Sequence, residues 1–346
     1  ITAAMEYGID TIIVDHHNPH EELPPAVAII NPKVGDEYPF EGLCACAVCS
    51  KVRQALAIGE TEVFGRLVTL INARPANETV IVEAIQLEHG IEVDRITEAL
   101  VPGVASLETS RLRDYLVGRE LVCYDEPLQK RLLRQGMGPN VDIYMLDLAE
   151  QIAELFPSLA GKSLLEMREG ARMAKYTEGD TEEIDVLFAL YRSVIEKRFP
   201  GIRESIESVA DLVALATLAD MMPITDENRT IVRRGLYRLN TTPNAGLAAL
   251  LHEAGMTGRT MVSRDIGWTI APMINATGRM GTPSEAVNLL LSQDPTERTA
   301  LARRVKELNQ ERRRIGESAW RTVLPQAAES MEKLSRKLVA VHEPTM

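Results

Sequence analysis

The chain has 346 residues, of which 45% are hydrophobic, 25% charged and only 4% aromatic, a composition that suits two domains with aliphatic cores. Its formal charge of −12 argues against attraction to nucleic acid or anionic lipid by net charge, although local basic stretches and bound cations can supply it. With no secretory signal and no apolar stretch of the roughly 18–20 residues that a membrane helix needs, we expect a cytoplasmic protein with no membrane partner.

Residues 1–60 are predicted to contain two helices and two short strands. Residues 1–6 have the pattern of the end of a helix. Residues 9–14 form a short β-branched run, as in parallel strands that are covered on both faces. A second strand is expected at residues 28–30, and a helix rich in small residues at 43–57.

Three of the four cysteines, Cys44, Cys46 and Cys49, lie in this helix, and Cys123 lies apart from them. They are too few and too clustered for a disulfide framework, which fits a reducing cytoplasm. Their C-x-C-x-x-C spacing fits no zinc ribbon. We interpret them as small residues that let a helix pack closely, in preference to metal ligands.

Residues 62–203 are predicted to form a separate unit in which strands alternate with helices. The predicted strands are 66–72, 79–87, 120–124 and 142–146. The predicted helices are 110–116, 128–134, 148–156, 163–174 and 181–198.

From residue 209 the pattern changes again. A long apolar run over residues 209–218 ends in Ala219-Asp220-Met221-Met222-Pro223. A polar turn is expected at residues 275–279, and a last strand at 337–342. The predicted helices are 228–239, 246–254, 284–291 and a long charged helix over 296–334.

Asp15-His16-His17 is the strongest chemical signal, because it directly follows a predicted buried strand. Ligands gather at the carboxyl ends of such strands, and imidazole with carboxylate suits Mn²⁺, Zn²⁺ or Mg²⁺ in hydrolytic sites. Adjacent residues there splay apart, so one histidine can bind metal while the other faces substrate, and Asp15 can orient the first histidine. The alternative is a polar surface loop.

Asp220 is the second signal, because an unpaired charge at the end of so apolar a run costs several kcal/mol if buried. The alternative is an exposed aspartate at a helix end or turn. The predicted turn Asn275–Arg279 places an arginine that can grip phosphate in a bidentate way, unless it is only a polar turn.

Two helices carry arginines that are spaced to follow a phosphate backbone. These are Arg229, Arg233, Arg234 and Arg238 in one helix and Arg303, Arg304, Arg312, Arg313 and Arg314 in the other. Because acidic residues are interleaved, a solvated helix face is the favoured interpretation for each.

Together these motifs resemble the DHH phosphoesterase superfamily and, within it, the RecJ single-stranded-DNA exonucleases. The motifs occur in the family's order, as GIDTIIVDHH (8–17), INPK (30–33), DLVALATLADMMP (211–223), ENR (227–229), NATGRMG (275–281) and ELNQERR (307–313). The resemblance covers about residues 1–60 and 205–346.

The fold class that this implies is α/β. A parallel-sheet DHH-type domain would comprise residues 1–60 and 205–295, interrupted by a second α/β domain inserted at 62–203. A long connecting helix would follow at 296–336, and the start of a truncated C-terminal domain at 337–346.

By the resemblance, His16 and Asp220 would be metal ligands, with His17 beside the scissile phosphate and Asp15 supporting both histidines. Arg279 and Asn275 would bind the substrate phosphate. The family's two-metal site uses Mn²⁺ or Mg²⁺ to lower the pKa of a water that attacks phosphorus.

The resemblance implies 5′-to-3′ hydrolysis of single-stranded DNA in recombination and repair, with a single-strand-binding protein or a helicase as partners. One alternative is a family member acting on short oligonucleotides, cyclic dinucleotides or pyrophosphate. Another is a replication or repair scaffold that has lost its metals; His16, His17 and Asp220 argue against it.

The family's D-x-D motif and its Asp-before-Gly motif are expected upstream of Ile1, since the chain opens without Met and inside a helical pattern. They supply about half of the metal-binding carboxylates, so we expect this chain alone to bind metal poorly and to be inactive.

Residues 62–203 also resemble DnaQ-like proofreading exonucleases in the order of strands and helices, over residues 79–87, 116–133, 146–149 and 156–159. Where that fold needs D-x-E this chain has Asn72-Ala73-Arg74, and Gln129 stands at the later Asp position. The resemblance then implies a binding or spacing module without a metal site. The alternative is an unrelated α/β insertion.

Overall fold

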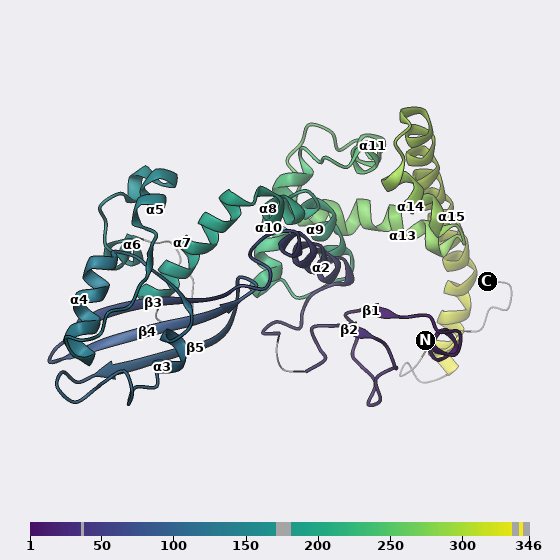
Figure 1. The fold of residues 1–346 in the computed structure, drawn as a ribbon. Coiled ribbons are helices and arrows are strands. Elements are labelled where there is room, and N and C mark those ends of the chain that lie inside the picture. The colour runs from purple at the N-terminus through teal and green to yellow at the C-terminus, as the bar shows by residue number, and fades with distance from the viewer. Residues whose placement is uncertain (36–37, 171–180, 334–338, 342–346) are drawn as a thin grey trace. The chain divides into compact units, whose positions relative to one another are not determined.

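The computed structural model describes residues 1–35, 38–170, 181–333 and 339–341, which form two compact units (Figure 1). The first unit comprises Ile1–Val52 and Ile206–Met346, and the second Arg53–Ser205. Both combine helices with strands, so the α/β class is confirmed. Their identities as a phosphoesterase domain and an inserted domain stay predictions. Among the described residues, none of the helices has the length and apolar character needed to cross a bilayer.

In the first unit a short parallel sheet consists of β1 (Ile12–Val14) and β2 (Ala28–Ile30), the two strands expected there. The prediction that β1 is covered on both faces was wrong. Ile12 is 64% exposed, and Ile13 and Val14 are half-buried. Within the described chain β1 pairs with β2 alone, and Val14 and Ile30 pack against a core on one side.

That core joins the sheet to helices α2 (Ala45–Gly59) and α9 (Ala210–Ala219). Its buried members are Leu43, Cys44, Ala47, Val48 and Val213. Segments about 160 to 200 residues apart in the sequence thereby share one apolar core, which places β1 close to the end of α9.

The remaining helices of the first unit pack around a second core that includes Leu247, Leu250, Ile270 and Val305. These helices are α10 (Asp226–Leu239), α11 (Ala245–Glu253), α13 (Ala271–Arg279), α14 (Pro283–Leu291) and α15 (Pro295–Lys333). Two short helices of the same unit, α1 (Thr2–Glu6) and α12 (Ser263–Asp265), have no buried residues. A π-helical turn, η3 (Ile266–Ile270), joins α12 to α13, and α8 (Pro200–Glu207) spans the boundary with the second unit.

The predicted turn at residues 275–279 was wrong, because these residues are the last five of α13. Asn, Thr and Gly suggest a turn, but Met273, Ala276 and Thr277 recur at helical spacing and are buried. The turn comes at Gly281, where φ is +79°. Of the strand predicted at 337–342, only 339–341 are described, without regular structure.

The second unit is built on a mixed sheet in the order β5–β4–β3–β6–β7. The strands are β3 (Leu67–Ala76), β4 (Thr79–Glu88), β5 (Ile91–Leu100), β6 (Glu120–Cys123) and β7 (Leu146–Asp147). β3 and β4 form an antiparallel pair, while β6 lies parallel to β3 and to β7. The edge strand β5 was not predicted from the sequence, because charged residues such as Glu92 and Arg95 mask its apolar alternation.

Helices cover both faces of this sheet. One core contains Leu112 and Leu133, and the other contains Ile152 and Leu187. The helices are α3 (Arg113–Leu116), α4 (Glu126–Met137), α5 (Ala149–Leu155), α6 (Leu164–Gly170) and α7 (Glu183–Arg198), with a 3₁₀ turn η1 (Pro157–Leu159). The part of the predicted helix 163–174 beyond residue 170 lies outside the described residues.

Helices α9 and α10 approach so closely at Gly235 that a side chain there has no room. A Cβ on Gly235 would lie 2.2 Å from Ala214 Cβ and 2.3 Å from Ala210 O. We therefore predict that Gly235→Ala lowers the free energy of unfolding by about 1–3 kcal/mol, measured by urea denaturation.

The control is Gly278→Ala in α13, where a Cβ would meet nothing within 4 Å. This change should be neutral or stabilise the fold by up to about 1 kcal/mol. Equal effects of the two substitutions would contradict the close packing of α9 on α10.

Candidate metal centre

The loop after β1 carries Asp15, His16 and His17 and is fixed by the neighbouring strand. The backbone N–H of Asp15 donates to the carbonyl of Ile30 at 3.0 Å. Asn31 directly follows β2, and its side-chain amide donates to the carbonyl of His17 at 2.9 Å. The histidines thus stand at the carboxyl ends of two parallel strands.

The Asp15 carboxylate holds this loop together. It accepts hydrogen bonds from the His17 ring Nδ1 at 2.7 Å and from the His16 backbone N–H at 2.7 Å. The His17 side chain, and then the two backbone donors, lower the pKa of Asp15 to about 2. The sequence analysis expected Asp15 to orient the first histidine, but it is the second ring that Asp15 contacts.

The two histidine rings differ in exposure. Their centroids lie 4.3 Å apart, so the rings do not splay to opposite sides as expected. The His17 side chain is 76% exposed, whereas that of His16 is 12% exposed. His16 Nε2 lies 3.5 Å from an Asp220 carboxylate oxygen, so the structure brings these two distant residues together.

Asp220 is the C-cap of α9 and is 47% exposed at its side chain. The next residue, Met221, has φ +55°, in the left-handed region that favours glycine. The N–H of Met222 donates to the carbonyl of Thr217, and that of Met221 to Leu218. These two hydrogen bonds end the helix at Asp220 and hold the Asp220 carboxylate beside His16. Asp220 is therefore a partly exposed aspartate at a helix end, which was the alternative interpretation from the sequence, and it also contacts His16.

The segment that follows Asp220 is clamped to the segment before α2. The buried Asn228 donates from its amide to the carbonyls of Gly42 and Pro223. The Glu227 carboxylate accepts the Tyr38 hydroxyl and pairs with Lys51. Burial, followed by the Glu227 contact, raises the pKa of Tyr38. Sequence reasoning missed Tyr38 and Lys51, because only folding brings them to Glu227.

The arrangement fits a divalent cation. Two ligand atoms that each lie about 2.1 Å from one metal ion, at an octahedral or tetrahedral angle, are about 3.0–3.5 Å apart from each other. The distance of 3.5 Å between His16 Nε2 and the Asp220 carboxylate oxygen lies within this range. One ligand atom each from Asp15, His16 and His17 also lie within 4.8 Å of one another. The metal role of these residues stays a prediction.

Arg279 and Asn275 lie on one face of α13, four residues apart. Both line a groove of about 600 Å³ that also includes Ala219 and Met221, the neighbours of Asp220. The two residues predicted to bind phosphate therefore face the same groove, which begins beside Asp220.

The cysteines contribute no disulfide: Cys44 and Cys123 are buried, Cys46 is half-buried and Cys49 is exposed. Burial raises the pKa of Cys46 to about 12 and that of Cys123 to about 12. Among the described residues, none of these cysteines belongs to a cluster of three or more potential metal ligands.

In the second unit, neutral amides occupy the positions where the DnaQ-like resemblance expects carboxylates. Asn72 and Gln129 are both 2% exposed. Gln129 accepts from the Ala73 N–H at 2.6 Å, and its amide donates to Asn72 at 3.3 Å. The pair itself therefore offers a cation no negative charge, and the Asn72 amide also donates to the Glu183 carboxylate at 3.3 Å.

No family model matches the chain. It is 38% identical to the single-stranded-DNA-specific exonuclease RecJ of Thermus thermophilus over 118 residues, which are 34% of this chain and 17% of that protein. With RecJ of Bacillus subtilis it shares 38% identity over 109 residues, 32% of this chain and 14% of the relative. The RecJ-like character predicted from the motifs is confirmed over these segments.

Among solved structures, the chain is similar to RecJ from Thermus thermophilus in complex with Mg²⁺, with 31% identity and a TM-score of 0.33. That match covers 45% of this chain and 24% of the solved chain. A complex of the same enzyme with Mn²⁺ gives 25% identity and a TM-score of 0.33, over 66% and 30% of the respective chains. The matched part spans less than a fifth of each of the two curated relatives named above.

The Asp15 carboxyl should titrate near pH 2, below its ordinary 3.8, because His17 hydrogen-bonds its ionised form. Since the folded pKa is the lower one, this ionised form stabilises the fold above about pH 4, and the contribution disappears as pH falls toward 2. In His17→Ala the pKa should rise toward 3.8, measured by NMR of the carboxyl carbon.

His20→Ala, which changes an exposed histidine of the same loop, serves as the control and should leave this titration unaltered. An Asp15 pKa that stays near 2 without the His17 ring would show that the ring is not its cause.

Proposed function

We propose that this RecJ-like chain carries part of the active site of a metal-dependent exonuclease that hydrolyses single-stranded DNA. The single observation that carries the proposal is the approach of His16 Nε2 to the Asp220 carboxylate at 3.5 Å. Two potential ligands that lie about two hundred residues apart in the sequence meet at a spacing compatible with one shared cation.

The metal is proposed to be Mn²⁺ or Mg²⁺, with His16 and Asp220 as ligands in this chain. Such a cation activates water for attack on phosphorus and neutralises charge on the phosphate. The site is proposed to be completed by carboxylates outside this chain, so the chain alone should bind metal weakly and be inactive.

His17 is proposed to move a proton. Because the Asp15 carboxylate accepts a hydrogen bond from Nδ1, it fixes the proton there and leaves Nε2 as the basic nitrogen. The ring is 76% exposed, so Nε2 is open to a bound substrate. Asp15 then acts as a positioning residue, both for this ring and for the His16 backbone.

Arg279 and Asn275 are proposed to hold the substrate phosphate from α13. The planar guanidinium of an arginine can bind a phosphate through two hydrogen bonds. Arg279 lines the groove that also includes Ala219 and Met221, the neighbours of Asp220. The similarity to single-stranded-DNA-specific exonucleases favours a polynucleotide over a cyclic dinucleotide or pyrophosphate.

Several finer assignments rest on the motif resemblance given in the sequence analysis. We propose 5′-to-3′ polarity, a place in recombination and repair, and cooperation with a single-strand-binding protein or helicase. We also propose that the first unit is the phosphoesterase domain, that α15 connects it to a C-terminal domain, and that the second unit is a binding or spacing module. The neutral Asn72–Gln129 pair supports this last role.

In the complete protein, His16→Ala should reduce Mn²⁺-dependent release of nucleotides from 5′-ended single-stranded DNA to background, because a metal ligand is lost. The measurement is the initial rate of nucleotide release. His20→Ala is the matched control and should retain activity.

Full activity of His16→Ala would refute the metal assignment. Equal or faster hydrolysis of a cyclic dinucleotide than of a long single strand would instead refute the proposed substrate. A complete protein that neither binds Mn²⁺ nor hydrolyses either substrate would favour the non-catalytic scaffold that has lost its metals.

A further inference from the structure

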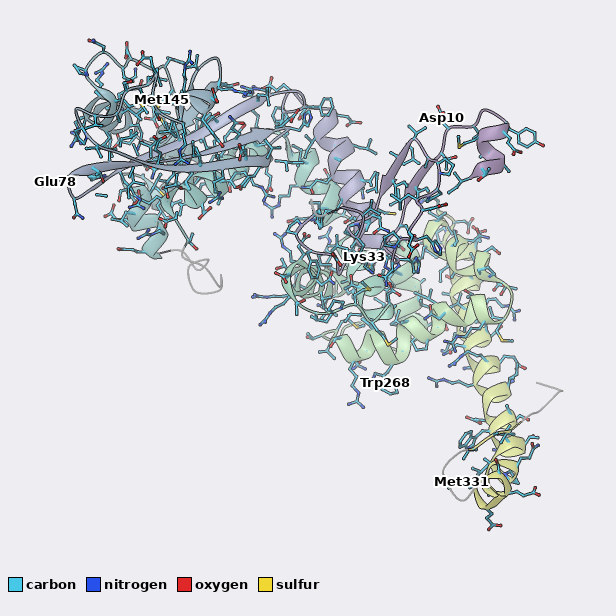
Figure 2. All side chains as sticks on the ribbon, turned by 90° about the horizontal axis from the view of Figure 1, so that it is seen from below. Asp10, Lys33, Glu78, Met145, Trp268 and Met331 are labelled. Atoms are coloured by element: carbon cyan, nitrogen blue, oxygen red, sulfur yellow. The ribbon has the colours of Figure 1, made fainter. Side chains whose placement is uncertain are left out.

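The chain has only two tryptophans, and both indoles are exposed. Trp268 is 76% exposed and Trp320 is 63% exposed. Trp268 lies in the π-helical turn η3, whose residues Gly267 and Trp268 face solvent, and Figure 2 labels it at the surface of the helical part of the first unit. Exposed indoles are amphipathic platforms that are enriched at binding sites.

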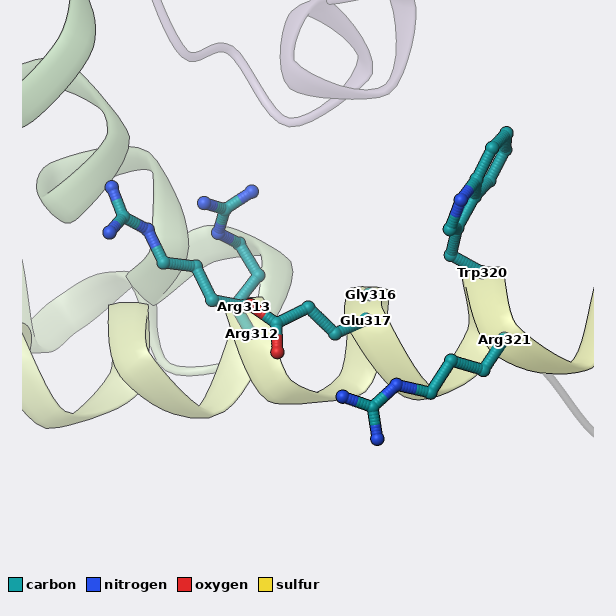
Figure 3. Close-up of a pocket in the computed structure, with 6 residues that line it drawn as sticks. All are labelled: Arg312, Arg313, Gly316, Glu317, Trp320 and Arg321. Atoms are coloured by element: carbon teal, nitrogen blue, oxygen red, sulfur yellow. The ribbon is translucent and has the colours of Figure 1, made fainter.

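Each tryptophan lines a groove, and the two grooves have lining residues in common. Trp268 lines the groove of about 600 Å³ that begins beside Asp220. Trp320 lines a second groove of about 580 Å³ on α15. Arg312 and Arg313 line both grooves. Figure 3 shows these arginines and Trp320 on the same side of α15. The Cα atoms of Arg312 and Trp320 are about 12 Å apart along the helix.

The arginines that line these grooves are available to bind an anion. Within the described chain, Arg279 and Arg313 have no acidic partner, and Arg312 donates only to the neutral Asn309 side chain, at 3.2 Å. The adjacent Arg314 differs, because it lies outside both grooves and pairs with Glu311 at 3.3 Å.

Four arginines, Arg279, Arg312, Arg313 and Arg321, line the two grooves against one acidic residue, Glu317. In a chain of net charge −12, this local excess of positive charge is complementary to a polyphosphate. Met221 adds an apolar side chain, 89% exposed, at the end beside Asp220.

We propose that Trp268, Arg279, Arg312, Arg313 and Trp320 form one tryptophan–arginine surface that binds single-stranded DNA and leads it to the metal centre. Bases stack on the two indoles, and the phosphates between them bind the arginines. Stacking on an aromatic face needs an unpaired base and tolerates any base. The surface therefore binds single strands in preference to duplexes, without sequence specificity. This inference rests on the proposed function, because the substrate is the same.

The test uses intrinsic fluorescence, since Trp268→Phe and Trp320→Phe each leave one reporter indole. The chain is titrated with oligothymidylate in EDTA, so that no hydrolysis is needed. We expect a long strand to quench both indoles and a dinucleotide to quench Trp268 more than Trp320, because the metal centre lies beside the Trp268 groove. Double-stranded DNA should quench neither.

Alanine variants test the energetics. Trp268→Ala and Trp320→Ala should each weaken binding of a long strand about 5- to 150-fold, the range for loss of one base–aromatic stack, while the phenylalanine variants retain most of the affinity. Arg313→Ala should weaken binding and flatten its logarithmic salt dependence by about 0.7, as for one lost phosphate contact. The matched control Arg314→Ala should change neither quantity. Urea denaturation confirms that the variants fold.

Quenching of Trp268 without any response of Trp320 would overturn the continuous surface, as would equal effects of Arg313→Ala and Arg314→Ala. Neither result would affect the proposed hydrolase, which is tested separately by nucleotide release in the complete protein. If both indoles bind DNA but His16→Ala retains full hydrolysis, the surface stands and the metal assignment fails.

Discussion

The approach of His16 to Asp220 is the interaction on which the candidate site depends. The two residues lie about two hundred positions apart in the sequence, yet their side chains come within 3.5 Å. The small apolar core of Leu43, Val48 and Val213 makes this possible, because it binds β1 and β2 to α2 and α9. The clamp at Asn228 then fixes the segment beyond Asp220. Local packing therefore determines the chemistry that the site can support.

The sequence predicted the helices and strands that have strong periodicity or clear boundaries. The family resemblance of the motifs implied that His16 and Asp220 lie together, and the structure brings their side chains within 3.5 Å. It failed where tertiary contacts override local signals: residues 275–279 continue α13 because side chains at helical spacing, including Met273, Ala276 and Thr277, are buried there. The exposure of Ile12 could not be predicted, because covering a strand depends on neighbours that its own residues do not specify. The charged edge strand β5 was missed for a similar reason.

The surface around the site combines strain, exposed aromatic area and local charge. Met221 stands in a left-handed conformation that costs a non-glycine residue about 1–2 kcal/mol, and its side chain faces the groove. Trp268 is presented by a π-helical turn, a feature found often at functional sites. Arginines supply positive charge here although the whole chain is acidic. These features lie in the first unit. In the second unit, the neutral Asn72 and Gln129 stand where the DnaQ-like resemblance would expect carboxylates.

The most direct test of the shared-cation claim is anomalous diffraction at the manganese edge, from crystals of the complete protein soaked in MnCl₂. The account predicts a peak within bonding distance of both the His16 Nε2 atom and the Asp220 carboxylate. A manganese ion bound elsewhere, or one that contacts only one of these two side chains, would contradict it.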